Sequence, residues 1–211
     1  YRMVHVVDLE RLGGLIKSMP WTAGFYLLGG LAISAVPPFN GFVSEFLIYN
    51  GLLRNWNVPA ESYGLLLLGA VLLALVGAIS AMAVVRSFGV SFLGVARDLN
   101  LHPQGEAPRS MLLPMAAHAI GILVLGLIPA TGLTLVQEIT HQFVSLLPDS
   151  AMDSEAIPQL FEIFQPIAVA VGVVVLLTSL VYLVRRMGLR ARLRFHVTWG
   201  CGYQGVTPRM Q

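Results

Sequence analysis

Glu45 is the residue of this chain best placed to do chemistry, because its carboxylate falls within a segment that is otherwise apolar. A charged side chain at membrane depth costs about 2.5 to 3.5 kcal/mol on insertion scales, and such residues mark ion or proton pathways. Non-helical backbone is tolerated at that depth only inside protein or beside a water-filled cavity. Four residues ahead of Glu45 interrupt a helix: Pro37, Pro38, Asn40 and Gly41. The pattern predicts a proton-carrying carboxylate beside a broken helix; the alternative is an interfacial helix start that the helix dipole stabilises without any pathway.

Three further side chains could pass protons on, and each also has a structural explanation. Ser44 and Tyr49 carry hydroxyl groups close to Glu45, but polar side chains also hold broken helices together. His118 lies within the apolar run 111–130, and an imidazole changes its charge near neutral pH, which suits a relay. A histidine hydrogen-bonded to a neighbouring helix is the alternative. The sequence therefore predicts Glu45 as the relay residue, with Ser44, Tyr49 and His118 as further candidates.

Composition places the chain among proteins that cross a membrane several times. Of its 211 residues, 56% are hydrophobic and 11% are charged, whereas a soluble domain carries about 25% charged residues. The prediction is an all-α, polytopic transmembrane protein whose partners include the lipid bilayer and protons. The net charge of +2 gives no sign of a nucleic-acid partner. One cysteine, Cys201, and five histidines without metal-binding spacing predict no catalytic site, metal or cofactor in this chain.

Apolar runs predict five membrane segments, one of them discontinuous. They cover residues 20–36, 39–56, 63–92, 111–130 and 166–184. The first is about 25 Å of helix, just long enough to span. The break is expected around Phe39–Gly41 or at Asn50-Gly51. The resulting organisation is an extramembrane loop (1–19), membrane helices (20–93), a cytoplasmic loop (94–109), a membrane helix (110–136), an acidic external loop (137–165), a membrane helix (166–186) and a basic cytoplasmic tail (187–211).

Basic residues set the expected orientation, because cytoplasmic loops are rich in Lys and Arg. Five arginines follow the last segment: Arg185, Arg186, Arg190, Arg192 and Arg194. They place the tail and the 94–109 loop in the cytoplasm, and the count of five spans then puts the 1–19 loop outside. Arg11 and Lys17 contradict that last placement. If the Glu45 segment re-enters the membrane instead of spanning it, the N-terminal loop falls inside.

Several motifs resemble those of one known family. They are Leu12-Gly13-Gly14-Leu15 before Met19-Pro20, the run from Pro37 to Glu45, Arg86-Ser87-Phe88-Gly89-Val90, Thr198-Trp199-Gly200-Cys201-Gly202-Tyr203, and Pro208-Arg209-Met210-Gln211. The chain is similar to the antiporter-like, proton-translocating membrane subunits of NADH:quinone oxidoreductase (complex I), formate hydrogenlyase, hydrogenase-4 and multisubunit cation/proton antiporters. The resemblance covers essentially the whole chain, and the terminal motif points to the hydrogenase-4 branch.

The resemblance implies a role for Glu45, which takes the place of the ionisable residue on the discontinuous helix of the family's second half-channel. The family's first repeat has no counterpart here, so the chain is expected to be a C-terminal fragment that does not translocate protons alone. His5 and Asp8 resemble part of a family loop, but Val6-Val7 stands where Thr-Arg is common. That difference weakens any role for the loop.

By the same resemblance, the whole protein is expected to conduct protons within a redox-driven complex of a bacterial inner membrane. Its partners would be other membrane and peripheral subunits, which carry out the redox chemistry. Two alternatives stay open: a cation/proton antiporter subunit, and a scaffold that only anchors peripheral hydrogenase subunits. Sodium-dependent transport without an electron donor would indicate the first, and a dispensable charge at position 45 the second.

Overall fold

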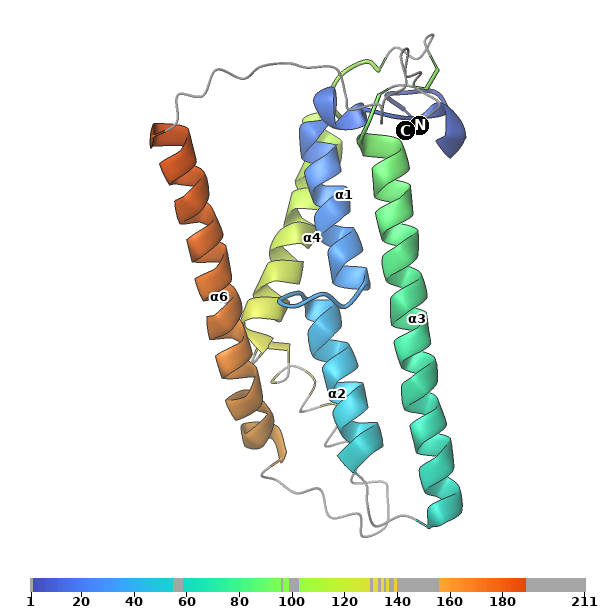
Figure 1. The fold of residues 1–211 in the computed structure, drawn as a ribbon, viewed down its shortest axis with the longest axis vertical. Helices are drawn as coiled ribbons and strands as arrows, with labels where there is room; N and C mark the ends of the chain where they lie inside the picture. Colours follow the sequence, from blue (N-terminus) through green and yellow to red (C-terminus); the bar gives the residue numbers. More distant parts are fainter. Residues whose placement is uncertain are drawn as a thin grey trace, which may run out of the picture.

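The computed structural model consists of helices and their connections, with no strand in any described segment. The structure describes residues 2–54, 59–95, 97–98, 103–129 and 156–188, together with 131, 132, 134, 136 and 139. The helices in these segments are η1 (Leu9–Arg11), η2 (Leu15–Lys17), α1 (Pro20–Ile33), α2 (Asn40–Arg54), α3 (Ala60–Phe92), α4 (Arg109–Leu127) and α6 (Ala156–Gly188). Figure 1 shows the α-helices running along the long axis of the molecule, and both α1 and α2 contact α3 and α4. The predicted all-helical fold is confirmed.

Helices α1 and α2 together follow α3 along its length, in the antiparallel direction. Four contacts pair successive positions of α1 and α2 with successively earlier positions of α3: Tyr26 with Ser87, Gly30 with Val84, Glu45 with Gly77, and Leu52 with Gly69. Alone, α1 with 14 residues and α2 with 15 residues are about 21 Å and 22 Å long. Neither reaches across a hydrocarbon core of about 30 Å. Stacked end to end, as in Figure 1, they match the length of α3.

The sequence predicts separate spans for 20–36 and 39–56, whereas the structure joins the two segments in one line. The reason is that α2 starts directly against the last turn of α1, so the chain continues in the same direction after the break. The second candidate break, Asn50-Gly51, lies inside α2 and does not interrupt it. The discontinuity is therefore at residues 34–39, between α1 and α2. Of the two breaks expected, this one corresponds to Phe39–Gly41.

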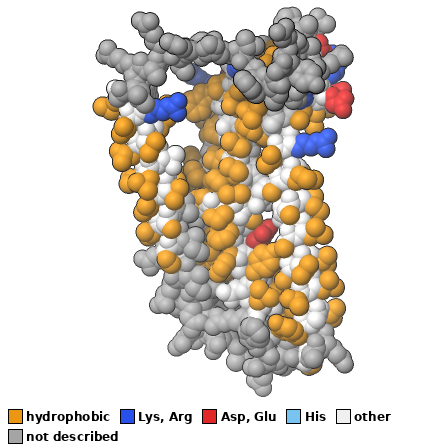
Figure 2. All heavy atoms as spheres, viewed as in Figure 1, with side chains coloured by type: hydrophobic (Ala, Val, Ile, Leu, Met, Phe, Trp, Pro, Cys, Tyr) orange, Lys and Arg blue, Asp and Glu red, His pale blue; other side chains and the backbone are white. Residues whose placement is uncertain are grey.

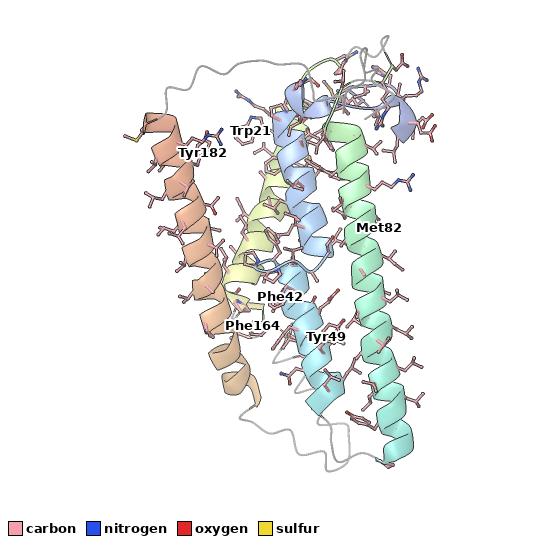
Figure 3. The ribbon with its side chains drawn as sticks, in the orientation of Figure 1. Trp21, Phe42, Tyr49, Met82, Phe164 and Tyr182 are labelled. Atoms are coloured by element: carbon pink, nitrogen blue, oxygen red, sulfur yellow. The ribbon has the colours of Figure 1, made fainter. Side chains whose placement is uncertain are left out.

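Helices α3 and α4 have the length and apolar composition needed to cross a membrane. Among the described residues, Ser62–Phe92 and Arg109–Leu127 meet that requirement, close to the predicted runs 63–92 and 111–130. An exposed apolar stripe with helical spacing follows the outer side of α3: Leu65, Leu68, Leu72, Leu75, Ile79 and Met82. Figure 3 shows Met82 pointing away from the other helices. Such a stripe is suited to contact with lipid, since water would not favour it.

Helix α6 stands beside the other helices and contacts them through its N-terminal part. The ring centroids of Phe164 in α6 and Phe46 in α2 are 5.0 Å apart, and Figure 3 shows Phe164 on the side of α6 toward α2. The helix already begins at Ala156, so residues 156–165 are helical where the sequence predicts part of an acidic loop. The rest of that loop over 140–155 and the tail over 189–211 lie outside the described residues.

At one end of the bundle, a hydrogen bond and an ion pair connect the N-terminal loop with the loop after α3. The Gly14 N–H donates to the Leu93 carbonyl over 2.9 Å, and the Arg11 guanidinium forms an ion pair with Asp98, with Nε donating to Oδ2 over 3.0 Å. Buried side chains of η2, α1 and α3 form a small core at the same place: Leu15, Ala23 and Phe92. The N-terminal loop and the loop after α3 therefore lie at the same end of the molecule.

Candidate functional site

Helix α1 ends in a Schellman motif, although no glycine supplies its left-handed residue. Ala35 has a φ of 50°. The Val36 N–H donates to the Leu31 carbonyl over 3.1 Å, and the Ala35 N–H donates to the Ala32 carbonyl over 3.2 Å. These are the two hydrogen bonds that define this helix end. The left-handed conformation costs a non-glycine residue about 1–2 kcal/mol, and the two prolines that follow prevent the helix from continuing.

Two glycines let the broken segment pack tightly against its neighbours. Gly41, in the first turn of α2, lies against the carbonyl oxygen of Ala32 in α1. Gly126, in the last turn of α4, lies against the carbonyl oxygen of Pro38 and the backbone of Phe39. A side chain at either glycine would overlap backbone atoms. On the α4 side the break is thus enclosed by protein, as non-helical backbone requires at membrane depth.

Glu45 is half-buried and its carboxylate faces Gly77 of α3, where an added Cβ atom would lie 3.5 Å from Oε1. Gly77 is 14 residues after Tyr63 and 15 before Phe92, so about 21 Å and 23 Å of helix separate it from the two ends of the apolar stretch. Figure 2 shows an acidic side chain isolated among hydrophobic ones, about halfway along the bundle where α2 meets α3. The Glu45 carboxylate therefore lies near the middle of the apolar slab.

The two predicted hydroxyl partners of Glu45 lie on the same helix. The Ser44 hydroxyl donates to the Gly41 carbonyl over 2.9 Å, a bond within α2, and a part for Ser44 in a relay stays a prediction. Tyr49 lies one turn beyond Glu45 on α2 (Figure 3) and is half-buried. Its contribution to a relay stays a prediction.

His118 lies on an exposed side of α4, and its Nδ1 is 2.8 Å from the carbonyl oxygen of Pro114. Since a carbonyl only accepts, Nδ1 donates and Nε2 is the nitrogen that can take up a proton. The bond is to the same helix, not to a neighbouring one as the sequence-based alternative had it. His118 precedes Gly126 by about 12 Å of helix, and Glu45 lies beyond the break that Gly126 contacts. The structure therefore does not bring His118 and Glu45 together.

Glu106 was missed by the sequence-based reasoning, yet it holds the start of α1. The Trp21 N–H donates to Glu106 Oε2 over 2.7 Å, and the Thr22 hydroxyl donates to Oε1 over 2.6 Å. The Ala107 N–H donates to Oε1 over 3.0 Å. A carboxylate at this position satisfies N–H groups that the first turn leaves without partners and complements the helix dipole. No local signal could reveal it, because 84 positions separate Glu106 from Thr22.

Glu106 makes the stability of the loop end depend on pH. Burial acts to raise the pKa of Glu106, but the hydrogen bonds from Thr22, Ala107 and Trp21 outweigh it and hold the pKa below its usual value. A carboxyl group whose pKa is lowered by folding stabilises the protein above its unfolded-state pKa, and that stabilisation is lost as pH falls through the folded-state pKa.

We expect Glu106→Gln to lower the stability of the full-length protein by about 1 kcal/mol at neutral pH, the usual effect of losing a helix cap. The measurement is thermal unfolding in detergent at neutral and at acidic pH. The difference from the wild type should shrink as the wild-type carboxyl group becomes protonated. Glu10→Gln, at an exposed position of η1, is the control and should unfold like the wild type. An equal loss for both variants would contradict the capping role.

A wide cavity of about 1150 Å³ opens at the same end of the bundle, between η1 and the last turns of α3. Its charged lining residues are Asp8, Glu10, Arg11, Arg86, Arg97 and Asp98. Charges of the two signs are equal in number, so the cavity favours neither anions nor cations. Arg86 is exposed near the end of α3, as expected of an arginine that extends to the membrane interface. Ala83, the lining residue of α3 nearest to Gly77, is about 9 Å of helix away from it, so the cavity is separate from the Glu45 site.

The fold and the site define a helical integral membrane protein with an ionisable residue beside a discontinuous helix. Residues 1–62 match the family described as NADH:quinone oxidoreductase/Mrp antiporter, TM. The chain belongs to this family of antiporter-like membrane subunits, as the motifs predicted.

Similarity to individual relatives extends over most of the chain. Hydrogenase-4 component B of Escherichia coli (strain K12) is 31% identical over 95% of this chain and 30% of its own length. Formate hydrogenlyase subunit 3 of the same organism is 38% identical over 56% of this chain and 20% of its own length. Na(+)/H(+) antiporter subunit A1 of Staphylococcus saprophyticus is 27% identical over 96% of this chain and 26% of its own length. The chain thus spans less than a third of each of these relatives.

Proposed function

We propose that the full-length protein is a proton-conducting membrane subunit of a larger redox-driven complex, and that Glu45 is the residue of this chain that exchanges the proton. The observation that carries the proposal is the half-buried carboxylate of Glu45 at the middle of the apolar slab, in the second turn after a helix break. Keeping a charge there is costly. Gly77 faces the carboxylate, and the described part of the chain forms no ion pair with it.

The relatives support this function and suggest in which kind of complex and membrane the protein works. Hydrogenase-4 component B and formate hydrogenlyase subunit 3 favour a hydrogenase-type complex in a bacterial inner membrane. Other membrane subunits would bind the sides of the bundle and peripheral subunits its cytoplasmic end. Electron transfer belongs to those partners, while this chain supplies the buried carboxylate and the broken helix that holds it.

The direct test uses the complete complex in lipid vesicles with an internal pH indicator. Proton movement that requires the electron donor, and that is the same in potassium and sodium buffers, is the expected result. Electron transfer without any change in internal pH would overturn the proposed function.

A cation/proton antiporter subunit is the second candidate, and the observation in its favour is the similarity to Na(+)/H(+) antiporter subunit A1 over 96% of the chain. The same vesicles distinguish the two functions. An antiporter would acidify or alkalinise the interior when a sodium gradient is imposed in the absence of the electron donor.

We also infer that α1 and α2 make one membrane crossing, so that α1–α2, α3, the segment that begins with α4, and α6 give four crossings where the sequence predicts five. The lengths of α1 and α2 and their end-to-end arrangement support this count. It also accounts for Arg11 and Lys17, which then lie on the same side as the loop after α3 and the C-terminal end of α6 (Figure 1). That side is the cytoplasmic one by the distribution of basic residues.

Single cysteines distinguish four crossings from five. In a full-length protein whose cysteines, Cys201 among them, are replaced by Ser, we expect Lys17→Cys and Gln104→Cys to react with a membrane-impermeant maleimide from the same side. Ser62→Cys, at the opposite end of α3, should react only from the other side. All three positions are exposed. Labelling of Lys17→Cys together with Ser62→Cys would restore five crossings.

A further inference from the structure

We propose that Gly126 is a positioning residue for Glu45, because it lets α4 hold the helix break at a fixed place. This inference rests on the proposed function of Glu45. It concerns a residue of another helix that is separated from Glu45 by the break itself, and that carries no group able to bind a proton.

The contact between α4 and the break involves backbone atoms only. Gly126 is buried, and the position that a Cβ atom would occupy overlaps the carbonyl oxygen of Pro38. The same position is 2.8 Å from Phe39 Cα and 2.9 Å from Phe39 C. Carbon atoms in contact are about 3.5–4.0 Å apart. A methyl group at position 126 would therefore displace the break or α4 by on the order of 0.5–1 Å, and no flexible side chain is available to move aside.

The α4 side of this contact has little freedom to yield. The Ile128 N–H donates to the Val124 carbonyl over 2.9 Å and closes the last turn around Gly126. Pro129 follows and is buried. The turn around Gly126 thus cannot open locally, so a methyl group there would push α4 and the backbone of Pro38 and Phe39 apart.

A displacement of Phe39 would be transmitted to Glu45 through α2. The Phe42 N–H donates to the Phe39 carbonyl over 3.1 Å, so Phe39 begins the first turn of the helix that carries Glu45. Gly41 is held against Ala32, which prevents that turn from unwinding. Glu45 follows Phe39 by about 9 Å of helix, and its carboxylate meets Gly77 at an ordinary contact distance. Moving the turn would therefore change the depth and surroundings of the carboxylate.

The experiment compares Gly126→Ala with Gly121→Ala in the full-length protein within its complex. Gly121 lies in the same helix, and a Cβ atom there would meet nothing within 4 Å. The probe is a hydrophobic carbodiimide, which modifies protonated carboxyl groups inside membranes, and labelling of Glu45 is followed by mass spectrometry as a function of pH. Because labelling does not depend on transport, it tests the positioning even if the proposed function fails.

We expect the labelling profile of Glu45 to shift along the pH axis in Gly126→Ala and to stay unchanged in Gly121→Ala. Donor-driven proton transport should fall at least about tenfold in Gly126→Ala alone, since a misplacement of 1 Å can cost up to about 10²-fold in a positioned group. An assembled Gly126→Ala complex with wild-type labelling and transport would overturn the proposal. If Gly126→Ala alters the labelling profile but the wild-type complex moves no protons, the proposed function is rejected and the positioning role of Gly126 stands.

If the Gly126→Ala complex fails to assemble, a double variant tests the proposal in its place. Adding Pro38→Ala to Gly126→Ala removes the ring constraint on residue 38, so that its carbonyl can turn away from the new methyl group. The methyl group would still lie 2.8 Å from Phe39 Cα, so this double variant is expected to assemble with a shifted Glu45 profile, and Pro38→Ala alone serves as its control. If the double variant shows the profile of that control, or if neither variant assembles, Gly126 is a packing residue only and the positioning role is rejected.

Discussion

Replacing Glu45 with glutamine in the full-length protein is expected to abolish donor-driven proton transport while the complex still assembles. Glutamine has nearly the shape of glutamate, but its amide neither binds nor releases a proton near neutral pH. Removing a group that exchanges protons typically lowers a rate by about 10² to 10⁴-fold. Stability should not fall, since the substitution takes a charge out of the apolar slab, where a charge is costly. The measurements are donor-driven pH change in vesicles and recovery of the intact complex.

Gly51→Ala is the matched control for this substitution. Gly51 lies in the same helix as Glu45, is exposed, and a Cβ atom there would meet nothing within 4 Å. We expect this variant to transport protons like the wild type, which would show that a change elsewhere on α2 is not enough to stop transport. If Glu45→Gln transports normally, the charge at position 45 is dispensable and the chain acts as a scaffold.

Much of the fold could be predicted because the membrane imposes simple rules. A long charge-free run must be helical, so α3 and α4 appear nearly where the sequence places them. The prolines at 37 and 38 must end a helix, and Glu45 must follow the break at membrane depth. These features depend on local composition, and local composition is what a sequence displays directly.

What could not be predicted depends on contacts between distant residues. The sequence shows a break at Pro37-Pro38 but not whether the chain turns back or continues, and the close approach of Gly41 to Ala32 decides this. Ala35 adopts the left-handed conformation without the glycine that would have signalled it. Glu106 looks like an ordinary loop carboxylate until α1 is placed beside it. Each of these residues fixes the path of α1 or α2, and therefore the position of Glu45.

Replacing Gly41 with alanine is expected to destabilise the full-length protein strongly, by about 3 kcal/mol or more, at the upper end of what overpacking costs. The added methyl group would overlap the carbonyl oxygen of Ala32 and lie 3.5 Å from Ala35 Cα. That carbonyl also accepts the hydrogen bond from the Ala35 N–H, so displacing it would open the end of α1. The break would then lose the contact that keeps α1 and α2 in line.

Gly51→Ala in the same helix separates this effect from helix propensity. Gly51 is exposed, and a Cβ atom there would meet nothing within 4 Å. Alanine is preferred to glycine inside a helix by about 0.5–1 kcal/mol, so Gly51→Ala should raise stability slightly while Gly41→Ala lowers it. The measurement is the fraction of complex that stays monodisperse in detergent after heating. Equal behaviour of the two variants would mean that α2 does not begin against the end of α1, and the single crossing by α1 and α2 would then lose its structural basis.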